Sequence, residues 1–247
     1  MSEFKFPTET VELPSKGFFY AEGHSLRDGK VEMRYMTAKD EDVLTNQNYI
    51  REGVVLDKLL QSMVVAPDFD LKDLIVGDKN ALLVAARILG YGANYTFTVN
   101  GKSESMDLSQ CENINNNFEG LTDGKNEFTF VTPTTKTKLT FKLLNGHDEV
   151  KIAKEIEGLV KVNKGGSDFL TRLRYIITSV NDDSSSEVIS EFVNDYFLAT
   201  DSREFRKHYK NCMPDVDLSY EGDDGRFRSA PIGLDFFWPN LEDSPEL

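Results

Sequence analysis

The chain has 247 residues, of which 39% are hydrophobic and 17 are Phe, a composition that indicates a folded core and excludes a disordered chain. It carries 28 Lys and Arg against 42 Asp and Glu, which gives a formal net charge of −14. Such a negative field repels nucleic acids and anionic membrane surfaces, and we identify no Lys/Arg cluster interleaved with aromatic residues to offset it. We therefore expect neither a nucleic acid nor a membrane as a partner.

The two cysteines and the first residues point to a reducing compartment. Cys111 and Cys212 lie far apart, so they form no disulfide framework and have no metal-ligand spacing. Residues 1–10 are mixed and charged, without the apolar centre of a signal peptide. The longest apolar runs are too short and too charged to cross a bilayer. We expect a cytosolic protein.

Residues 1–92 are predicted to form an extended arm followed by a strand and helices. Alternation of apolar and charged residues predicts a strand over 30–36. Thr37 and Asp40 have the spacing of a capping box, so a helix should begin there and run to about residue 46.

Two longer helices are predicted in the same part of the chain. Apolar residues at helical spacing indicate one over 53–64 and another from about residue 78. Gly90 and Gly92 are typical of a glycine C-cap and should end the second.

Residues 93–145 are predicted to form a small antiparallel β-rich insert. Asn100-Gly101 is a strong turn signal between alternating segments, so we expect a hairpin over 94–108. A second alternating pair covers 127–131 and 138–143.

Residues 146–239 are predicted to be mostly helical and to pack with the N-terminal part. Helices are expected over 147–162, 167–180, 184–197 and 201–212. A terminal strand pair is expected over 216–220 and 230–237, before an acidic tail at 240–247. The predicted fold class is α+β, mainly helical, with a small antiparallel β-rich insert and a C-terminal strand pair.

The predicted helix 167–180 carries two cations beside its apolar stripe. Arg172 and Arg174 need carboxylates or carbonyls, because an unpaired buried arginine costs several kcal/mol. We favour an intramolecular ion pair in which Arg172 holds this helix to another. The alternative is an interface role, since arginine is enriched at binding hot spots.

Phe236, Phe237 and Trp238 raise a similar choice between core and interface. Alternate side chains of a strand point to opposite faces, so three consecutive aromatics cannot all enter one core. Either a second layer of this chain covers the outer face or a partner does.

No catalytic or metal-binding motif emerges from the sequence. His24, His147 and His208 stand in separate segments without a shared pattern. Gly165-Gly166 follows a lysine but lacks the Gly-Lys-Ser/Thr sequence of a phosphate-binding loop. The acidic loop after Asp215 lacks the register and the terminal glutamate of a calcium-binding loop. We expect no enzyme activity, no cofactor and no bound metal.

Three motifs nevertheless give the chain a family resemblance. They are Thr171-Arg172-Leu173, which continues into Arg174, then Phe236-Phe237-Trp238-Pro239, and Met36 to Leu44. Together, taken in their order along the chain from 36–44 through 171–173 to 236–239, they resemble the baseplate hub proteins of T-even-type contractile-tailed phages, whose characteristic motif is Ser-Arg-Leu. Some relatives carry paired cysteines in the hairpin at 95–108, where this chain has Asn100 to Ser103. A metal role is therefore not transferable.

The resemblance implies a non-enzymatic role in building the central hub of the tail baseplate. Partners would be other baseplate hub and tail proteins, with the tape-measure protein among the candidates. The protein would act in the host cytoplasm during assembly, and the virion baseplate is one destination. The alternative is a transient tail-assembly chaperone that keeps a hub or tape-measure protein soluble and is absent from the virion.

Overall fold

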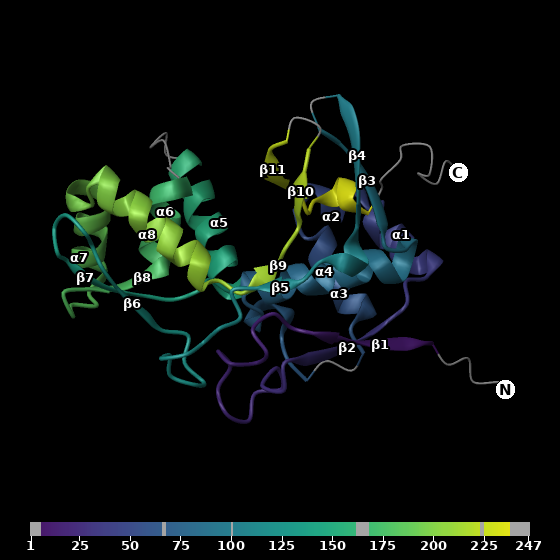
Figure 1. Cartoon of the computed structure of the whole chain (residues 1–247), viewed down its shortest axis with the longest axis horizontal. Helices are drawn as coiled ribbons and strands as arrows, with labels where there is room; N and C mark the ends of the chain where they lie inside the picture. Colours follow the sequence, from purple (N-terminus) through teal and green to yellow (C-terminus); the bar gives the residue numbers. More distant parts are fainter. Residues whose placement is uncertain (1–5, 66–67, 100, 162–167, 223–224, 238–247) are drawn as a thin grey trace.

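A computed structural model describes residues 6–65, 68–99, 101–161, 168–222 and 225–237, which form two lobes with separate hydrophobic cores (Figure 1). These residues are 43% helical and 22% strand, arranged as helices with several small antiparallel sheets. The expectation of a mainly helical fold is therefore wrong, and the fold is a mixed α+β one. One physical origin of the error is the β-branched end of the helix predicted over 167–180, where Ile177–Val180 pairs as a strand instead.

The first lobe is assembled from the N-terminal part of the chain and its C-terminal segment. Its elements are β1 (Thr8–Glu12), β2 (Lys30–Arg34), α1 (Ala38–Leu44), α2 (Gln47–Arg51), α3 (Val55–Met63), α4 (Val76–Tyr91), β3 (Asn94–Val99), β4 (Lys102–Asp107), β10 (Ser219–Glu221) and β11 (Phe227–Ser229). Each pair β1–β2, β3–β4 and β10–β11 is antiparallel. The capping box of Thr37 and Asp40 and the hairpin at 94–107 are confirmed.

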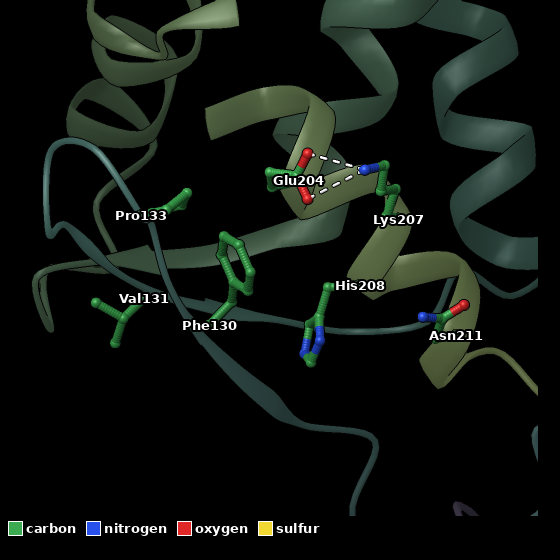
Figure 2. Close-up of a pocket in the computed structure, with 7 residues that line it drawn as sticks. All are labelled: Phe130, Val131, Pro133, Glu204, Lys207, His208 and Asn211. Carbon is green, nitrogen blue, oxygen red and sulfur yellow. Dashed lines mark hydrogen bonds and ion pairs between the residues drawn. The ribbon is translucent and has the colours of Figure 1, made fainter. Parts of the chain in front are cut away.

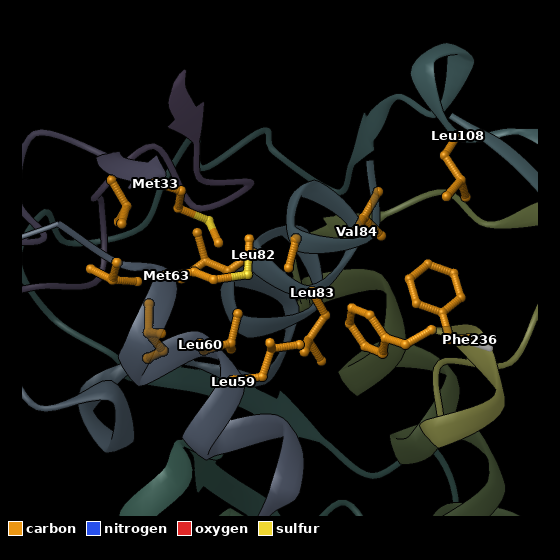
Figure 3. Packing of buried hydrophobic residues seen from close by; sticks show 14 of the residues in the cluster. Met33, Leu59, Leu60, Met63, Leu82, Leu83, Val84, Leu108 and Phe236 are labelled. Atoms are coloured by element: carbon orange, nitrogen blue, oxygen red, sulfur yellow. The ribbon is translucent and has the colours of Figure 1, made fainter. Parts of the chain in front are cut away.

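Helix α4 runs through the centre of the first core. Figure 3 shows Leu82, Leu83 and Val84 of α4 among Leu59 and Leu60 of α3. All five are buried, because an apolar stripe wide enough to meet neighbours on several sides must be covered. The helix starts two residues earlier than predicted.

The second lobe is built around a three-stranded sheet in the order β6-β7-β8. Its elements are β6 (Phe128–Val131), β7 (Lys138–Phe141), α5 (Gly146–Lys161), α6 (Asp168–Ile176), β8 (Ile177–Val180), α7 (Ser186–Glu191), a π-helical turn (Phe192–Tyr196) and α8 (Ala199–Cys212). Phe128 and Phe141 are opposite each other and stacked, and Phe205 of α8 packs edge-on against Phe141. One face of the sheet is thereby buried under α8.

Two short strands and the N-terminal segment join the lobes. Strand β5 (Asn113–Ile114) pairs with β9 (Asp215–Val216), and β9 lies against α4. Phe19 belongs to the second core, whereas Tyr20 belongs to the first. The segment 93–145 is likewise shared, since β3 and β4 pack on the first core and β6 and β7 on the second.

The helix predicted over 167–180 ends four residues early, and its last four residues form a strand. Helix α6 ends at Ile176, and Ile177–Val180 is strand β8 on the edge of β7; Ser167 lies outside the described residues. Ile177 and Val180 are buried in the sheet, a position that β-branched side chains favour over a helix.

Two further expectations are wrong in the C-terminal part. The strand expected over 230–237 is absent there, because Leu234–Phe236 forms a 3-10 turn and the observed partner of β10 is β11. Pro231 lacks the N–H that a ladder needs, which weakens that segment as a strand. The helix expected over 184–197 is also not continuous, because α7 ends at Glu191 and a π-helical turn follows, on which Tyr196 is 61% exposed.

Candidate interaction surface

The segment Thr171-Arg172-Leu173-Arg174 lies on α6, and both of its arginines reach α5. The guanidinium of Arg172 donates to Glu149 of α5 at 2.8 Å and to Asp168, one turn earlier on α6, at 3.1 Å. Arg174 donates to Glu155 of α5 at 2.5 Å. Two arginines of α6 are thus paired with two glutamates of α5, which is the intramolecular ion-pair geometry.

The other two members of the motif serve packing. Thr171 is buried, and its hydroxyl accepts a hydrogen bond from Arg174 at 3.2 Å. Leu173 is buried in the second core. Because the side chain of Arg172 is 40% exposed, its ion pairs contribute little stability.

The C-terminal aromatics lie inside the first lobe. Phe236 and Phe237 are fully buried, with the ring of Phe236 edge-on to Tyr95 at 4.7 Å between centroids. The 3-10 turn removes the alternation of a strand, so both rings reach one core. Trp238 lies outside the described residues. The chain itself therefore covers the two phenylalanines.

A buried arginine that the sequence analysis missed holds this segment. Arg87 of α4 is 2% exposed and donates to the carbonyls of Phe236, Gly92 and Asn94 at 3.0, 2.8 and 3.1 Å. Burial lowers the pKa of its guanidinium. No local signal could have identified it, because its partners are carbonyls, which every residue carries.

Buried carboxylates have structural partners as well. Asp78 of α4 accepts from the backbone N–H of Ser15 at 2.9 Å and from the hydroxyls of Ser15 and Tyr20, both at 2.6 Å. Burial raises the pKa of Asp78. Asp201 of α8 accepts from the backbone N–H groups of Thr134 and Thr135 at 2.8 and 3.0 Å. These charges therefore fix loops to helices.

Two of the three histidines share one carboxylate between the lobes. His24 and His147 place their Nε2 atoms 3.5 and 2.9 Å from different oxygens of Asp73. The Nδ1 of His24 accepts from the N–H of Leu26, so in the neutral ring the proton is on Nε2, facing Asp73. In that tautomer Nε2 carries a proton and cannot bind a metal ion. Among the described residues, no group of three or more His, Cys, Asp or Glu side chains could hold a metal ion.

His208 lies in an open groove between β6 and α8, which we call the β6 edge groove (Figure 2). The groove has a volume of about 420 Å³ and is lined by Phe130, Val131, Pro133, Glu204, Lys207, His208 and Asn211. The helical members recur at i, i+3, i+4 and i+7, so they form one stripe of α8. A second hollow continues along the strand beyond His208 and is lined in part by Phe128 and Thr129.

The centre of the groove is aromatic. The rings of Phe130 and His208 lie 5.1 Å apart between centroids, and Figure 2 shows both between the strand and the helix. Burial lowers the pKa of His208, whereas its hydrogen bond to the backbone of Thr129 acts in the opposite direction. Beside these rings, Val131 is 57% exposed.

Two exposed cations lie along α8 at the groove, although the chain as a whole is acidic. Lys207 lines the groove, and Arg203, one turn earlier, lies beside Glu204, which also lines it. Glu204 is the acidic residue among them and pairs with Lys207 at 2.9 Å. The net charge of the whole chain does not reveal this stripe, because 42 acidic residues outnumber 28 basic ones overall.

No protein-family model, curated protein or solved structure matches this chain. Among the described residues, no helix is both long enough and apolar enough to cross a bilayer. The function must therefore be inferred from the chain's own geometry and motifs.

Proposed function

We propose that this chain is a non-catalytic component of phage tail baseplate assembly, a hub subunit or hub assembly factor that works through protein–protein contacts. The motifs in 36–44, 171–173 and 236–239 suggest the assembly. Other baseplate hub and tail proteins are the proposed partners, with the tape-measure protein among them. The proposed place of action is the host cytoplasm, before or during incorporation into the tail.

The observation that carries the proposal is the contrast between the interior and the β6 edge groove. Inside, buried charges such as Asp78, Arg87 and Asp201 are bonded to loops and turns of the same chain. In the groove, by contrast, the apolar side chain of Val131 and the cation Lys207 remain exposed at the edge of a sheet. An apolar side chain exposed at the open edge of a sheet favours a binding surface, because the unpaired edge is a template for another strand.

Co-expression with hub and tape-measure proteins tests the proposal. A stable complex of fixed stoichiometry in size-exclusion chromatography is the expected result, and it should persist when Arg172 is replaced by Ala if that residue serves only to hold α6 to α5. Consistent separation of all components would contradict the proposal.

Mass spectrometry of purified virions separates the two forms of the role. A hub subunit should be present at stoichiometric amounts. A transient chaperone of a hub or tape-measure protein should be absent from virions while still binding its client in infected cells.

A further inference from the structure

We infer that the β6 edge groove docks an extended, acidic segment of a partner protein, which adds to β6 as a fourth strand of the β6-β7-β8 sheet. This inference rests on the proposed function and specifies its mode of contact. Strand addition to an open sheet edge is a general mode of peptide recognition, in which backbone hydrogen bonds give affinity and side-chain contacts give specificity.

The register of the sheet identifies which backbone groups of β6 point outward. Val131 is opposite Lys138, and both backbone groups of Lys138 are bonded to Asn181, on the β8 side. Hydrogen-bonded and non-bonded pairs alternate along an antiparallel ladder. Val131 and Thr129 therefore direct their N–H and C=O groups away from β7.

Most of these outward groups are free to bind. The side chain of His208 hydrogen-bonds to the backbone of Thr129, and as a donor it takes the carbonyl. The N–H and C=O of Val131 and the N–H of Thr129 have no partner among the residues that the structure describes. An unpaired strand edge of this kind is a template for another strand.

Charge selects the chemistry of the added strand. Lys207 lines the groove and is 58% exposed, and Arg203, one turn earlier on α8, is 70% exposed. Glu204, which pairs with both Lys207 and Arg203, is the opposing charge. Two cations against one anion on this stretch of α8 favour an acidic segment and disfavour a basic one.

The same charges argue against a second copy of this chain as the occupant. Two copies joined edge to edge through β6 would bring the basic row of one α8 towards that of the other. Like charges in an interface are unfavourable. A different protein with Asp or Glu beside an extended segment fits better.

Replacing Val131 by Pro or by Thr tests the backbone pairing. Val131→Pro removes an outward N–H but no bond of the β6–β7 ladder, so the sheet should be retained, as proline is tolerated on edge strands. Val131→Thr keeps the N–H and the branched shape. In the co-expressed complex, Val131→Pro should weaken binding about tenfold or more, whereas Val131→Thr should bind normally. Thermal unfolding of each free variant reports whether it is folded.

A double variant on α8, with a control in the first lobe, tests the role of the basic side chains while leaving the residues of β6 unchanged. Arg203→Gln combined with Lys207→Gln should weaken the complex by roughly tenfold and flatten its salt dependence. Lys30→Gln, which removes an exposed lysine of the first lobe, is the matched control and should have no effect. Equal binding by Val131→Pro, or by the double variant, would overturn the inference while leaving the proposed function intact.

Selection of displayed random peptides tests the inference without any phage partner. Peptides retained by the wild-type chain and lost on Val131→Pro should be rich in Asp and Glu, and should slow amide exchange at Val131 and Thr129. If no selected peptide depends on the Val131 N–H, β6 does not accept an added strand and the inference is wrong. If the dependent peptides are not acidic, the inferred chemistry of the added strand is wrong. This result stands even if the hub complex never forms, a failure that would count against the proposed function alone.

Discussion

Methionine substitution of Arg87 and of Arg172 should have very different effects on stability. Both arginines bridge separate parts of the fold, but Arg87 is 2% exposed and bonded to three carbonyls, whereas the side chain of Arg172 is 40% exposed and bonded to two carboxylates. Methionine keeps much of the length and apolar volume of arginine while removing the donors. The pair therefore separates the value of buried bonds from that of surface ion pairs.

The expected cost at Arg87 follows from its partners. A hydrogen bond from a charged group contributes about 1.5–3 kcal/mol, and a buried acceptor left without a donor costs about 1–3 kcal/mol. The bond to Phe236 is buried, while water can reach the carbonyls of Gly92 and Asn94 in part. Removing the buried charge also removes its desolvation cost, so we expect a net loss of about 3 kcal/mol.

The expected cost at Arg172 is smaller because solvent screens it. Glu149 is 36% exposed and Asp168 is 61% exposed, and exposed ion pairs contribute about 0–1 kcal/mol. Arg172→Met should therefore lower the free energy of unfolding by less than about 1 kcal/mol.

Urea unfolding followed by far-ultraviolet circular dichroism measures both. At an unchanged dependence on urea, the midpoint should fall clearly for Arg87→Met and hardly for Arg172→Met. Total stabilities are about 5–15 kcal/mol, so the loss at Arg87 should be easily resolved. Equal losses, or a loss below about 1 kcal/mol at Arg87, would refute the assignment of Arg87 as the tie between α4 and the C-terminal turn.

Three further substitutions test the packing and the buried carboxylates. Gly77→Ala places a Cβ against the carbonyl of Pro214, so it should lower stability by about 2 kcal/mol or more in the same urea assay. Burial raises the pKa of Asp40, but hydrogen bonds from Arg34 and neighbouring hydroxyls outweigh it and hold that pKa well below its usual value. The stability that ionised Asp40 gives the fold is present above about pH 4 and is lost as the pH falls. The Asp40→Asn variant should therefore lose less stability in acid than the wild-type chain does. Burial instead raises the pKa of Asp78. The contribution of this carboxyl group to the free energy of unfolding is therefore complete below about pH 4, and it declines as the pH rises through the raised pKa. Asp78→Asn should remove that decline in urea unfolding measured across pH, and an unchanged pH profile in either variant would contradict the assigned direction.

Local signals in the sequence were sufficient for many elements of the fold. The capping box at Thr37 and Asp40, the hairpin turn at Asn100-Gly101 and the helices around α3, α4, α5 and α8 depend on residues a few positions apart. Capping, turn preference and apolar periodicity are short-range effects, so the sequence alone determined them.

The tertiary structure decided what long-range partners control. Ile177–Val180 is a strand because β7 offers it an edge and a buried face, while an isolated segment of this kind fits a helix equally well. Phe236 is core because a 3-10 turn and Arg87, 149 positions away, hold it there. The open edge of β6 exists only because the order of strands leaves it last in its sheet. Hydrogen-bond partners and burial depend on distances in space, which the sequence leaves undefined until the chain has folded.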